Sequence, residues 1–550
     1  MIGDWDGRVQ RLGREAFAAR TNDRAQLRSA TLLRVIRDDD TPMPGFTFDA
    51  RELAGAAQLA RIGELNRSAR ERRRDPDLLR AVAEVFEDLA AGLEPGSPQR
   101  IPWLTTAAAT WSLAGYQANS VVLANTLIGE LDAVRDLRVA AGGPDADSSP
   151  RGEADAAMAT VLDGTARIVA AVLVRDVNAV ARLGSQATAA LPGLGAIMIG
   201  ASNDNADDDG AFGGTDSPAS LSSLAVLGAY GLLGRSATAL ARFWITGDRA
   251  AAATAIASLD RATMTLLNAG VVDTFNLVDN LAHVVEDIVA VSPWRRLRDT
   301  DRWGDRWRCY LSTRALDRYP LLQVWPSQQA AIDIGLLRAP RSNLLITMPT
   351  SAGKTNIAEW AILDAVGGAE NKCAVYIVPT RSLASEAEAT LSRSLSRLGL
   401  TVSAMFGGLE HVDHELDLLI DSHVVVATSE KLDLLMRNSP EFAERIALVI
   451  VDEGHLIGDK ARGLRLELML TRLRRRAPSA RLLLTSAVVP NKRKLEEGHQ
   501  TRPAAARSSR NRWARSSAMP CTSRVFCRRQ PSASRRSNSF PASSSSPSAA

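Results

Sequence analysis

The chain has 550 residues, which allows two to four domains, and its 45% hydrophobic content excludes a wholly disordered protein. Its formal net charge of +4 is unevenly distributed, because residues 498–550 contain ten Arg and no Lys, Asp or Glu. Removing these ten Arg leaves 56 basic and 62 acidic residues in 1–497, a net charge of −6. The whole-chain charge is therefore no argument for binding to nucleic acid.

Cysteine usage and the N-terminal residues bear on the compartment. Two of the four cysteines, Cys521 and Cys527, lie in the C-terminal segment. The other two, Cys309 and Cys373, are too few and too far apart for a disulfide framework or a zinc site. The N-terminus carries charges where a signal peptide needs an apolar stretch. We therefore expect a cytoplasmic protein.

The N-terminal part of the chain has the apolar spacing of α-helices, for example in Asp77–Leu93 and in the Ala-rich stretch Thr105–Leu127. The apolar runs Ala187–Ala201 and Leu221–Leu233 are shorter than about 18 residues, so we expect buried helices and no membrane span. The predicted organisation is a helical region 1–140, a linker 141–152, and a helical region 153–320 with a surface loop at 201–220. No catalytic motif is recognisable in this part, which leaves a partner-binding role open.

Residues 321–491 have a different pattern, in which short apolar runs alternate with helical stretches. This alternation predicts an α/β domain with a parallel sheet, whose ligands lie at the carboxyl ends of the strands. The predicted strands are Asn343–Met348, Cys373–Val378, Val402–Phe406, His423–Ala427, Ala447–Val451 and Arg481–Thr485.

The segment Met348–Thr355, Met-Pro-Thr-Ser-Ala-Gly-Lys-Thr, follows the first predicted strand and leads into a helix. Backbone N–H groups of such a turn converge on one point and favour phosphate oxygens. Lys354 is then placed to reach the β- and γ-phosphates of ATP, and the hydroxyl of Thr355 to ligate Mg²⁺. Met348 stands where such loops usually have their first Gly. The predicted nucleotide-binding residues of the loop are Thr350, Ser351, Ala352, Gly353, Lys354 and Thr355.

An acidic motif, Asp452-Glu-Gly-His455, ends the most apolar strand. Asp452 is predicted to hold Mg²⁺, and Glu453 to orient and deprotonate the attacking water. His455 is predicted to link this site to the nucleic-acid side. An acidic pair alone is common at a strand end, and its position after a phosphate loop favours the catalytic interpretation. Gln328, 26 residues before Lys354, has an amide suited to the edge of adenine.

Several ordered motifs in residues 321–491 resemble those of superfamily 2 DEAD/DEAH-box helicases, in particular the DExH branch of superkiller-type and archaeal repair helicases. The resemblance implies a RecA-like first motor domain, with ATP and Mg²⁺ as cofactors and DNA or RNA as partner. The segments that carry it are Trp325–Ile332, Met348–Thr355, Pro379–Ala384, Thr428–Lys431, Asp452–His455 and Thr485–Ala487.

The same resemblance implies that Thr380, Arg381 and Thr428 contact strand phosphates, and that Gly407 and Gly408 let the backbone approach the strand. Such contacts would make binding independent of sequence and sensitive to salt. Ser486 and Ala487 fit the motif that couples hydrolysis to unwinding. The family's third residue in this motif is Thr and this chain has Val488, which puts the tightness of coupling in question.

Residues 498–550 contain no Leu, no Ile and fourteen Ser, a composition that cannot bury a core. We expect 492–550 to be a disordered tail. One interpretation is a natural Arg/Ser tail that binds RNA, and the one we favour is a truncated or out-of-frame continuation of the gene. The family's second motor domain supplies arginine fingers, so this interpretation predicts a chain that binds ATP with little turnover. The alternative function is a nucleotide-gated regulatory protein without unwinding activity.

Overall fold

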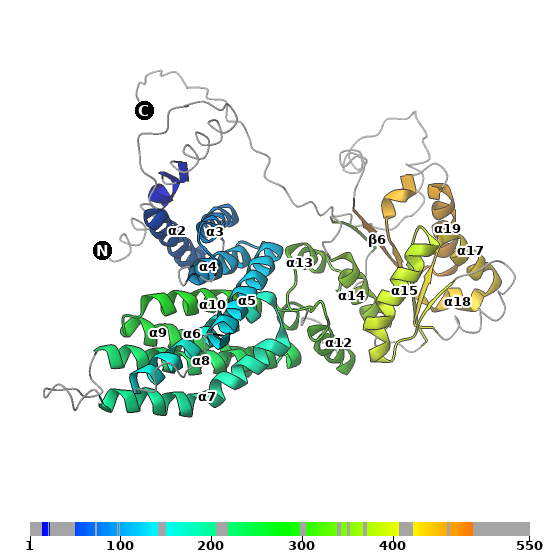
Figure 1. Ribbon diagram of the computed structural model, residues 1–550. Coiled ribbons are helices and arrows are strands. Elements are labelled where there is room, and N and C mark those ends of the chain that lie inside the picture. The colour runs from blue at the N-terminus through cyan, green and yellow to red at the C-terminus, as the bar shows by residue number, and fades with distance from the viewer. Residues whose placement is uncertain are drawn as a thin grey trace, which may run out of the picture. The chain divides into compact units, whose positions relative to one another are not determined.

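The computed structural model describes residues 14–19, 21–22, 50–71, 74–95, 97, 100–140, 150–204, 218–297, 304–337, 343–348, 353–366, 371–405, 422–458 and 462–487. The chain forms two compact units (Figure 1). Unit 1 comprises Met1–Asp299 with Arg308–Val324, and unit 2 comprises Thr300–Trp307 with Trp325–Ala550.

The described part of unit 1 is helical, which confirms the predicted fold class of the N-terminal region. Its helices pack around a large apolar core that includes Leu79, Trp111 and Trp244, and a smaller separate cluster includes Leu127 and Ala170. The helices are α2 (Ala50–Glu71), α3 (Pro76–Ala91), α4 (Arg100–Leu113), α5 (Gln117–Ala140), α6 (Pro150–Val174), α7 (Val177–Asp204), α8 (Pro218–Thr246), α9 (Arg249–Asn268), α10 (Val272–Ala290), α11 (Pro293–Arg296) and α12 (Asp305–Ala315), the last shared with unit 2.

Some helix boundaries differ from the sequence-based expectation. Asp77–Leu93 corresponds closely to α3, which begins with Pro76 after the N-cap Asp75. The stretch Thr105–Leu127 is not one helix, because helical structure is interrupted between α4 and α5 at Gly115, where φ is 87°. Its apolar pattern continues across the break, and a positive φ suits Gly in a turn.

The predicted linker and surface loop are shorter than expected. Helix α6 begins at Pro150, inside the predicted linker 141–152. Helix α7 extends to Asp204 and α8 begins at Pro218, both inside the predicted loop 201–220. The remaining residues of both segments, 141–149 and 205–217, lie outside the described part of the chain.

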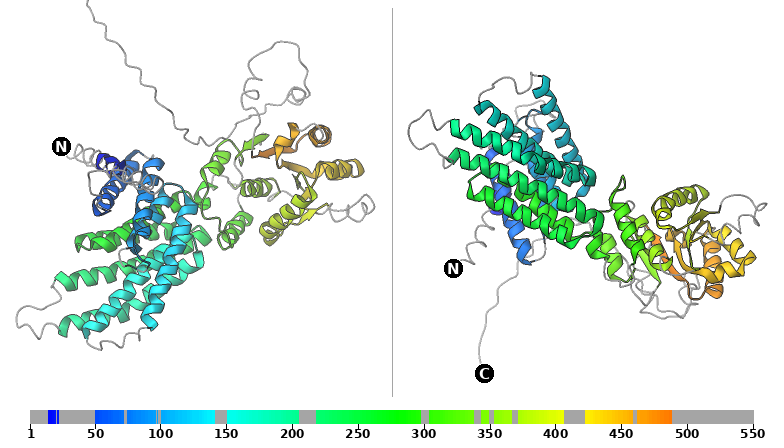
Figure 2. Two further views of the ribbon diagram at one scale, coloured as in Figure 1. Left: turned by 45° about the horizontal axis from the view of Figure 1, so that its top comes forward. Right: turned by 90° about the horizontal axis from the view of Figure 1, so that it is seen from below.

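Helices α6 to α9 lie side by side (Figure 2), and two of them approach unusually closely. A Cβ on Gly184 of α7 would lie 2.7 Å from the backbone oxygen of Gly234 in α8. A Cβ on Gly234 would lie 2.8 Å from the Cβ of Ala187. Small residues thus allow the backbones of α7 and α8 to meet.

Two apolar helical segments of the described chain, Gly152–Val174 and Leu221–Thr246, are long enough to cross a membrane by length and composition. Within their most apolar windows, 56% and 61% of the residues are buried inside the structure. Packing in the core of a helical bundle accounts for apolar helices of this kind.

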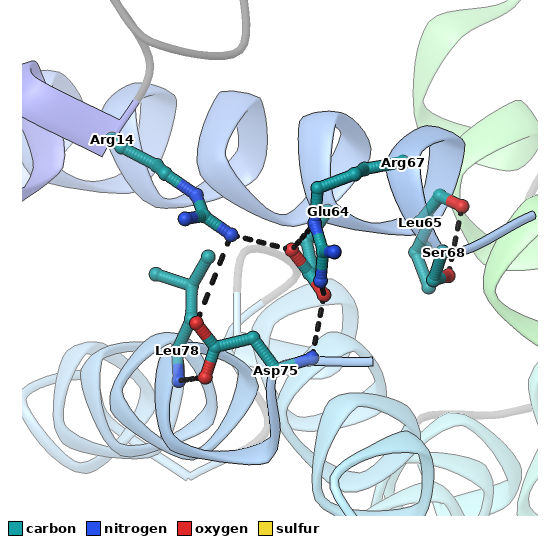
Figure 3. Close-up of polar contacts among 7 residues, drawn as sticks. All are labelled: Arg14, Glu64, Leu65, Arg67, Ser68, Asp75 and Leu78. Atoms are coloured by element: carbon teal, nitrogen blue, oxygen red, sulfur yellow. Dashed lines mark hydrogen bonds and ion pairs between the residues drawn. The ribbon is translucent and has the colours of Figure 1, made fainter. Parts of the chain in front are cut away.

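A buried carboxylate ties α2 to the start of α3 (Figure 3). The side chain of Glu64 accepts hydrogen bonds from Arg14 at 2.7 Å, from Arg67 and from the backbone N–H of Asp75 at 2.6 Å. Burial alone would raise the pKa of Glu64, but these donors hold that pKa below its ordinary value.

The described part of unit 2 contains a six-stranded parallel sheet with the order β1-β6-β5-β2-β4-β3. This confirms the predicted α/β class, and each predicted strand agrees with an observed one to within two residues at either end. The strands are β1 (Leu344–Thr347), β2 (Cys373–Ile377), β3 (Val402–Ala404), β4 (Val424–Ala427), β5 (Ile446–Val451) and β6 (Arg481–Ser486).

Helices cover both faces of this sheet, which explains why its central strands are almost wholly apolar. Alternate residues such as Val375, Val449 and Leu482 pack against α17, α18 and α19, which lie together in Figure 1. Helix α14 packs on the other face, against β2 and β5. The helical segments are α13 (Pro326–Asp333), α14 (Lys354–Val366), α15 (Arg381–Leu395), η2 (Ser396–Leu398), α17 (Ser429–Asn438), α18 (Pro440–Arg445), η4 (Gly454–Gly458) and α19 (Arg462–Arg476).

The strand order determines which motifs are neighbours. Strand β6 lies between β1 and β5, so Thr485 and Ser486 fall between the phosphate loop and the acidic motif. Strands β2 and β4 lie on the other side of β5 and lead to Thr380 and Thr428. The carboxyl edge of the sheet is thus divided into a predicted nucleotide half and a predicted strand-binding half.

Candidate nucleotide site and nucleic-acid groove

The described residues on either side of the phosphate loop are the expected strand and helix. Strand β1 is followed by Met348, whose backbone N–H donates to the oxygen of Ser486 at 3.0 Å. Gly353 has a φ of 83°, and α14 begins at Lys354. Thr355 is exposed in the first turn of α14. The predicted phosphate contacts Thr350, Ser351 and Ala352 lie outside the described residues.

Gln328 is buried and bonded to the phosphate loop. Its Oε1 accepts from the backbone N–H of Trp325 at 2.9 Å, and its Nε2 donates to the oxygen of Gly353 at 3.4 Å. A Cβ on Gly353 would lie 2.1 Å from Nε2. The amide therefore joins the start of α13 to the loop, and its contact with adenine stays a prediction.

Three donors hold the carboxylate of Asp452. Its Oδ1 accepts from the hydroxyl of Thr485 and from the backbone N–H of Glu453, each at 2.9 Å. Its Oδ2 accepts from the hydroxyl of Tyr376 at 3.1 Å. These contacts join β5 to β6 on one side and to β2 on the other.

Tyr376 is a residue of this site that the motif comparison did not find. Burial and the neighbouring Asp452 raise the pKa of its phenol well above the ordinary value, so the hydroxyl remains a donor. It lies within the apolar strand β2, three residues before the motif that contains Thr380. The sequence marks Tyr376 only as a hydroxyl in an otherwise apolar strand. Its partner Asp452 follows from the pairing of β2 with β5, which the sequence does not give.

Glu453 lies between the phosphate-loop lysine and the third motif. Its Oε1 accepts from Lys354 Nζ at 3.4 Å. Its Oε2 lies 3.2 Å from His455 Nδ1, which is 3.3 Å from Ser486 Oγ. The structure therefore brings together four predicted residues: Lys354, Glu453, His455 and Ser486.

Two features distinguish Glu453 from an ordinary strand-end acid. Its φ of 52° is in the left-handed region, which few residues other than Gly adopt. Its Oε2 is buried and makes no hydrogen bond within the described residues, because His455 Nδ1, although 3.2 Å away, is not in hydrogen-bond geometry with it. A buried acceptor without a donor is a place for a water molecule, as a general base requires.

A groove of about 690 Å³ lies beside this site and is lined by the ends of β2, β4 and β5. It contains Asp452 together with the predicted strand contacts Thr380, Arg381 and Thr428. Helices α15 and α17 both begin at this groove. The predicted contacts Gly407 and Gly408 lie outside the described residues.

The N-termini that meet at the groove differ in their caps. Thr380 Oγ1 accepts from the backbone N–H of Leu383 at 3.3 Å and so caps α15. Within the described residues, the hydroxyl of Thr428 caps no N–H of α17. The first turn of α17 therefore keeps N–H groups available to an anion.

Arginines lie beside two of the three acidic side chains of the groove, Asp433 and Glu430, but not beside Asp452. Asp433 accepts from Arg437 and from Arg472, the latter at 2.5 Å. Glu430 lies 3.8 Å from Arg465. The arginines beside Asp433 and Glu430 reduce the repulsion that a phosphate backbone would meet on approaching Arg381.

The residues present fit a magnesium ion held jointly with a nucleotide. Asp452 and Thr355 offer carboxylate and hydroxyl oxygens, the hard ligands that Mg²⁺ prefers. Within the described residues, no group of three or more His, Cys, Asp or Glu side chains could hold a metal by itself.

A parallel α/β sheet with Lys354 at the start of a helix after β1 and an acidic pair after β5 defines a P-loop nucleotide-binding domain. Comparison with protein families then identifies the particular domain. Residues 325–496 match the model described as DEAD/DEAH box helicase. These residues are a DEAD/DEAH helicase domain of superfamily 2, as the motifs predicted.

Curated relatives match the same part of the chain. It is 34% identical over 184 residues to the Hachiman protein HamB of Bacillus cereus, covering 33% of this chain and 16% of that protein. It is 39% identical over 155 residues to the ATP-dependent DNA helicase Hel308 of Thermoplasma volcanium, covering 28% of this chain and 22% of that protein. The chain thus spans less than a quarter of the length of either relative.

Solved helicase structures overlap the chain to a similar extent. The DEAD-box helicase Mss116 bound to single-stranded RNA has a TM-score of 0.31 and 19% identity, covering 36% of this chain and 42% of that one. The DUF1998 helicase MrfA bound to DNA has a TM-score of 0.29 and 19% identity, covering 36% of this chain and 28% of that one.

Proposed function

We propose that unit 2 binds Mg-ATP at the β1-β6-β5 half of its sheet edge and a nucleic-acid backbone at the β2-β4 half. The observation that supports this most is the groove, which contains Asp452 of the acidic motif together with Thr380, Arg381 and Thr428. In the intact family, such a pair of sites couples ATP hydrolysis to strand separation. The proposed activity of the whole protein is therefore ATP-dependent unwinding or remodelling.

Nucleotide binding would rest on the start of α14. The positive end of this helix and the ammonium of Lys354 both attract phosphate oxygens. Lys354 is bonded to Glu453 in this structure, so a γ-phosphate would exchange one anionic partner of the lysine for another. That exchange would release Glu453 Oε1 as the nucleotide enters.

Hydrolysis needs a base that is close to the phosphate and has a free lone pair. Glu453 would provide one, because its buried Oε2 makes no hydrogen bond within the described residues, and His455 Nδ1 lies beside it at 3.2 Å. Mg²⁺, when bound by Asp452 and Thr355, would neutralise charge on the phosphates. His455 lies between Glu453 and Ser486 and so links the base to the coupling motif.

Strand binding would use phosphate contacts and no base readout. The N-termini of α15 and α17 offer backbone N–H groups, and Arg381 adds a positive charge at the groove. Binding should therefore be independent of sequence and should weaken as salt rises.

A filter-binding experiment with labelled single-stranded DNA and RNA tests the groove. Arg381→Ala is expected to weaken the binding of both strands. It should also make the slope of log affinity against log salt concentration shallower by about one unit. Arg393→Ala is the matched control, since Arg393 is exposed in the last turn of the same helix. Equal effects of the two substitutions would count against the groove, and unequal weakening of DNA and RNA would indicate the preferred strand.

ATP binding is tested separately by isothermal titration calorimetry of the full chain with Mg-ATP. Binding by the unmodified chain and its loss in Lys354→Ala are expected. Absence of binding by a folded, unmodified chain would refute the nucleotide half of the proposal. ATP-dependent strand separation by the full chain would exclude the alternative, a nucleotide-gated regulatory protein without unwinding activity.

A further inference from the structure

The two oxygens of the Asp452 carboxylate are held differently. From the described residues Oδ1 accepts two hydrogen bonds, from Thr485 and from the backbone of Glu453. Oδ2 accepts one, from Tyr376. An ionised carboxylate has about four lone-pair positions, two on each oxygen. Oδ1 therefore has both of its positions filled, and Oδ2 retains one.

Tyr376 is well placed to fix the direction of that remaining position. It lies within β2, which pairs with β5 so that Tyr376 is opposite Ile450, two residues before Asp452. The ring is buried and the hydroxyl is its only polar atom. Because β2 is an inner strand, paired with β5 on one side and β4 on the other, the backbone that carries the ring is held on both sides.

Resting on the proposed nucleotide site, we infer that Asp452 holds Mg²⁺ through Oδ2, directly or through water, and that Tyr376 is the positioning residue for that oxygen. A hydrogen bond from the hydroxyl fixes the rotation of the carboxylate about its Cβ–Cγ bond together with the two bonds to Oδ1. Residues that orient a metal ligand in this way typically change metal affinity about 10- to 100-fold when they are removed.

The test is the Mg²⁺ concentration needed for half-maximal binding of a fluorescent ATP analogue by the full chain. Tyr376→Phe keeps the ring and removes the donor. We expect it to raise this concentration about 10-fold and to leave analogue binding in EDTA unchanged. Ser394→Ala is the matched control, because Ser394 also presents a buried hydroxyl beside α14, bonded to Glu359 and not to Asp452.

A second measurement separates positioning from general damage. In an Asp452→Asn background, Tyr376→Phe should have no further effect on the Mg²⁺ requirement, because its effect passes through the carboxylate. Additive effects of the two substitutions would overturn the inference. So would an unchanged Mg²⁺ requirement in Tyr376→Phe, or equal weakening with Mg²⁺ and with EDTA. Failure of the unmodified chain to bind the analogue would instead refute the proposed nucleotide site.

Discussion

Unusual backbone conformations occur at the candidate nucleotide site. Gly353 of the phosphate loop has a φ of 83°, and Glu453 of the acidic motif has a φ of 52°. The left-handed region costs a residue with a Cβ about 1–2 kcal/mol, so such a residue stays there only when its surroundings hold it. Glu453 is held by Lys354 on one carboxylate oxygen and by the bond from its own N–H to Asp452.

A substitution at Gly353 should separate the strain of the loop from its binding role. Gly353→Ala places a Cβ in the left-handed region and against Gln328 Nε2, so the Gln328–Gly353 bond must break. We expect a loss of roughly 1–2 kcal/mol in stability and at least about 10-fold weaker Mg-ATP binding. Denaturant unfolding and calorimetric titration of the purified variant measure the two effects.

Gly335→Ala is the control for that experiment. Gly335 also has a positive φ, 103°, but a Cβ there meets no atom within 4 Å. This variant should lose stability to a similar degree and keep its affinity for Mg-ATP. Weaker binding in both variants would mean that Gly353 acts through domain stability alone.

At the scale of helices, close contact between α7 and α8 depends on glycines that face each other. Two glycines in α8 provide a matched pair. Gly234 faces Ala187 and the backbone of Gly184, whereas a Cβ on Gly228 meets no atom within 4 Å. Both lie inside α8, where Ala has the better intrinsic helix propensity by about 1 kcal/mol.

The two substitutions should therefore change the stability of unit 1 in opposite directions. Gly228→Ala is expected to stabilise unit 1 by roughly 0.5–1 kcal/mol through helix propensity. Gly234→Ala is expected to destabilise it by about 1–3 kcal/mol, because α7 and α8 must move apart. Hydrogen–deuterium exchange of the α8 amides locates both effects. If these amides exchange as slowly in Gly234→Ala as in the unmodified chain, the contact between α7 and α8 is not tight.

Charged contacts between α2 and α3 should make unit 1 sensitive to acid. The pKa of Glu64 is lowered in the folded protein, so its contribution is present above the unfolded-state value near 4.5. That contribution disappears as pH falls through the lower folded-state pKa. Glu64→Gln should therefore destabilise the protein at pH 7 by about 1–3 kcal/mol and flatten the loss of stability below pH 5.

Melting temperatures at pH 7, 5 and 4 measure this dependence. Glu84→Gln is the control, because Glu84 is 53% exposed and lies 4.0 Å from Arg80 in a surface ion pair. Such pairs contribute roughly 0–1 kcal/mol, so the control should change little. If the melting temperature of Glu64→Gln falls below pH 5 as much as that of the unmodified chain, the acid sensitivity of α2 and α3 comes from other groups.

At the scale of the whole chain, the sequence predicted unit 2 far better than unit 1. Strands such as Ile446–Val451 are buried on both faces and read as unbroken apolar runs between helices. Asp452 and Glu453 follow such a strand directly, and Lys354 begins the helix that comes after another. The Tyr376–Asp452 contact was not predictable, because it depends on the pairing of β2 with β5. The break at Gly115 was also missed, since the apolar period continues through it.

The final prediction concerns binding and turnover by the full chain. The ammonium of Lys354 would contact the phosphates, so Lys354→Ala should weaken Mg-ATP binding by about 100-fold, which removes the calorimetric signal. Lys372→Ala removes the same charge beside the amino end of β2 and should bind normally. Glu453→Gln should leave binding largely intact, because Glu453 would act on the attacking water.

ATP hydrolysis also needs a positive charge that stabilises the developing negative charge on the γ-phosphate from the side facing away from Lys354. In related motors this is the task of an arginine finger, worth about 10³–10⁵ in rate. The recognisable motifs of this sequence are those of one motor domain, so we expect phosphate release near background with single-stranded DNA or RNA. A phosphate-release assay beside the calorimetric titration decides the matter. Strong stimulated release that Glu453→Gln abolishes would show that another part of the chain supplies the missing positive charge.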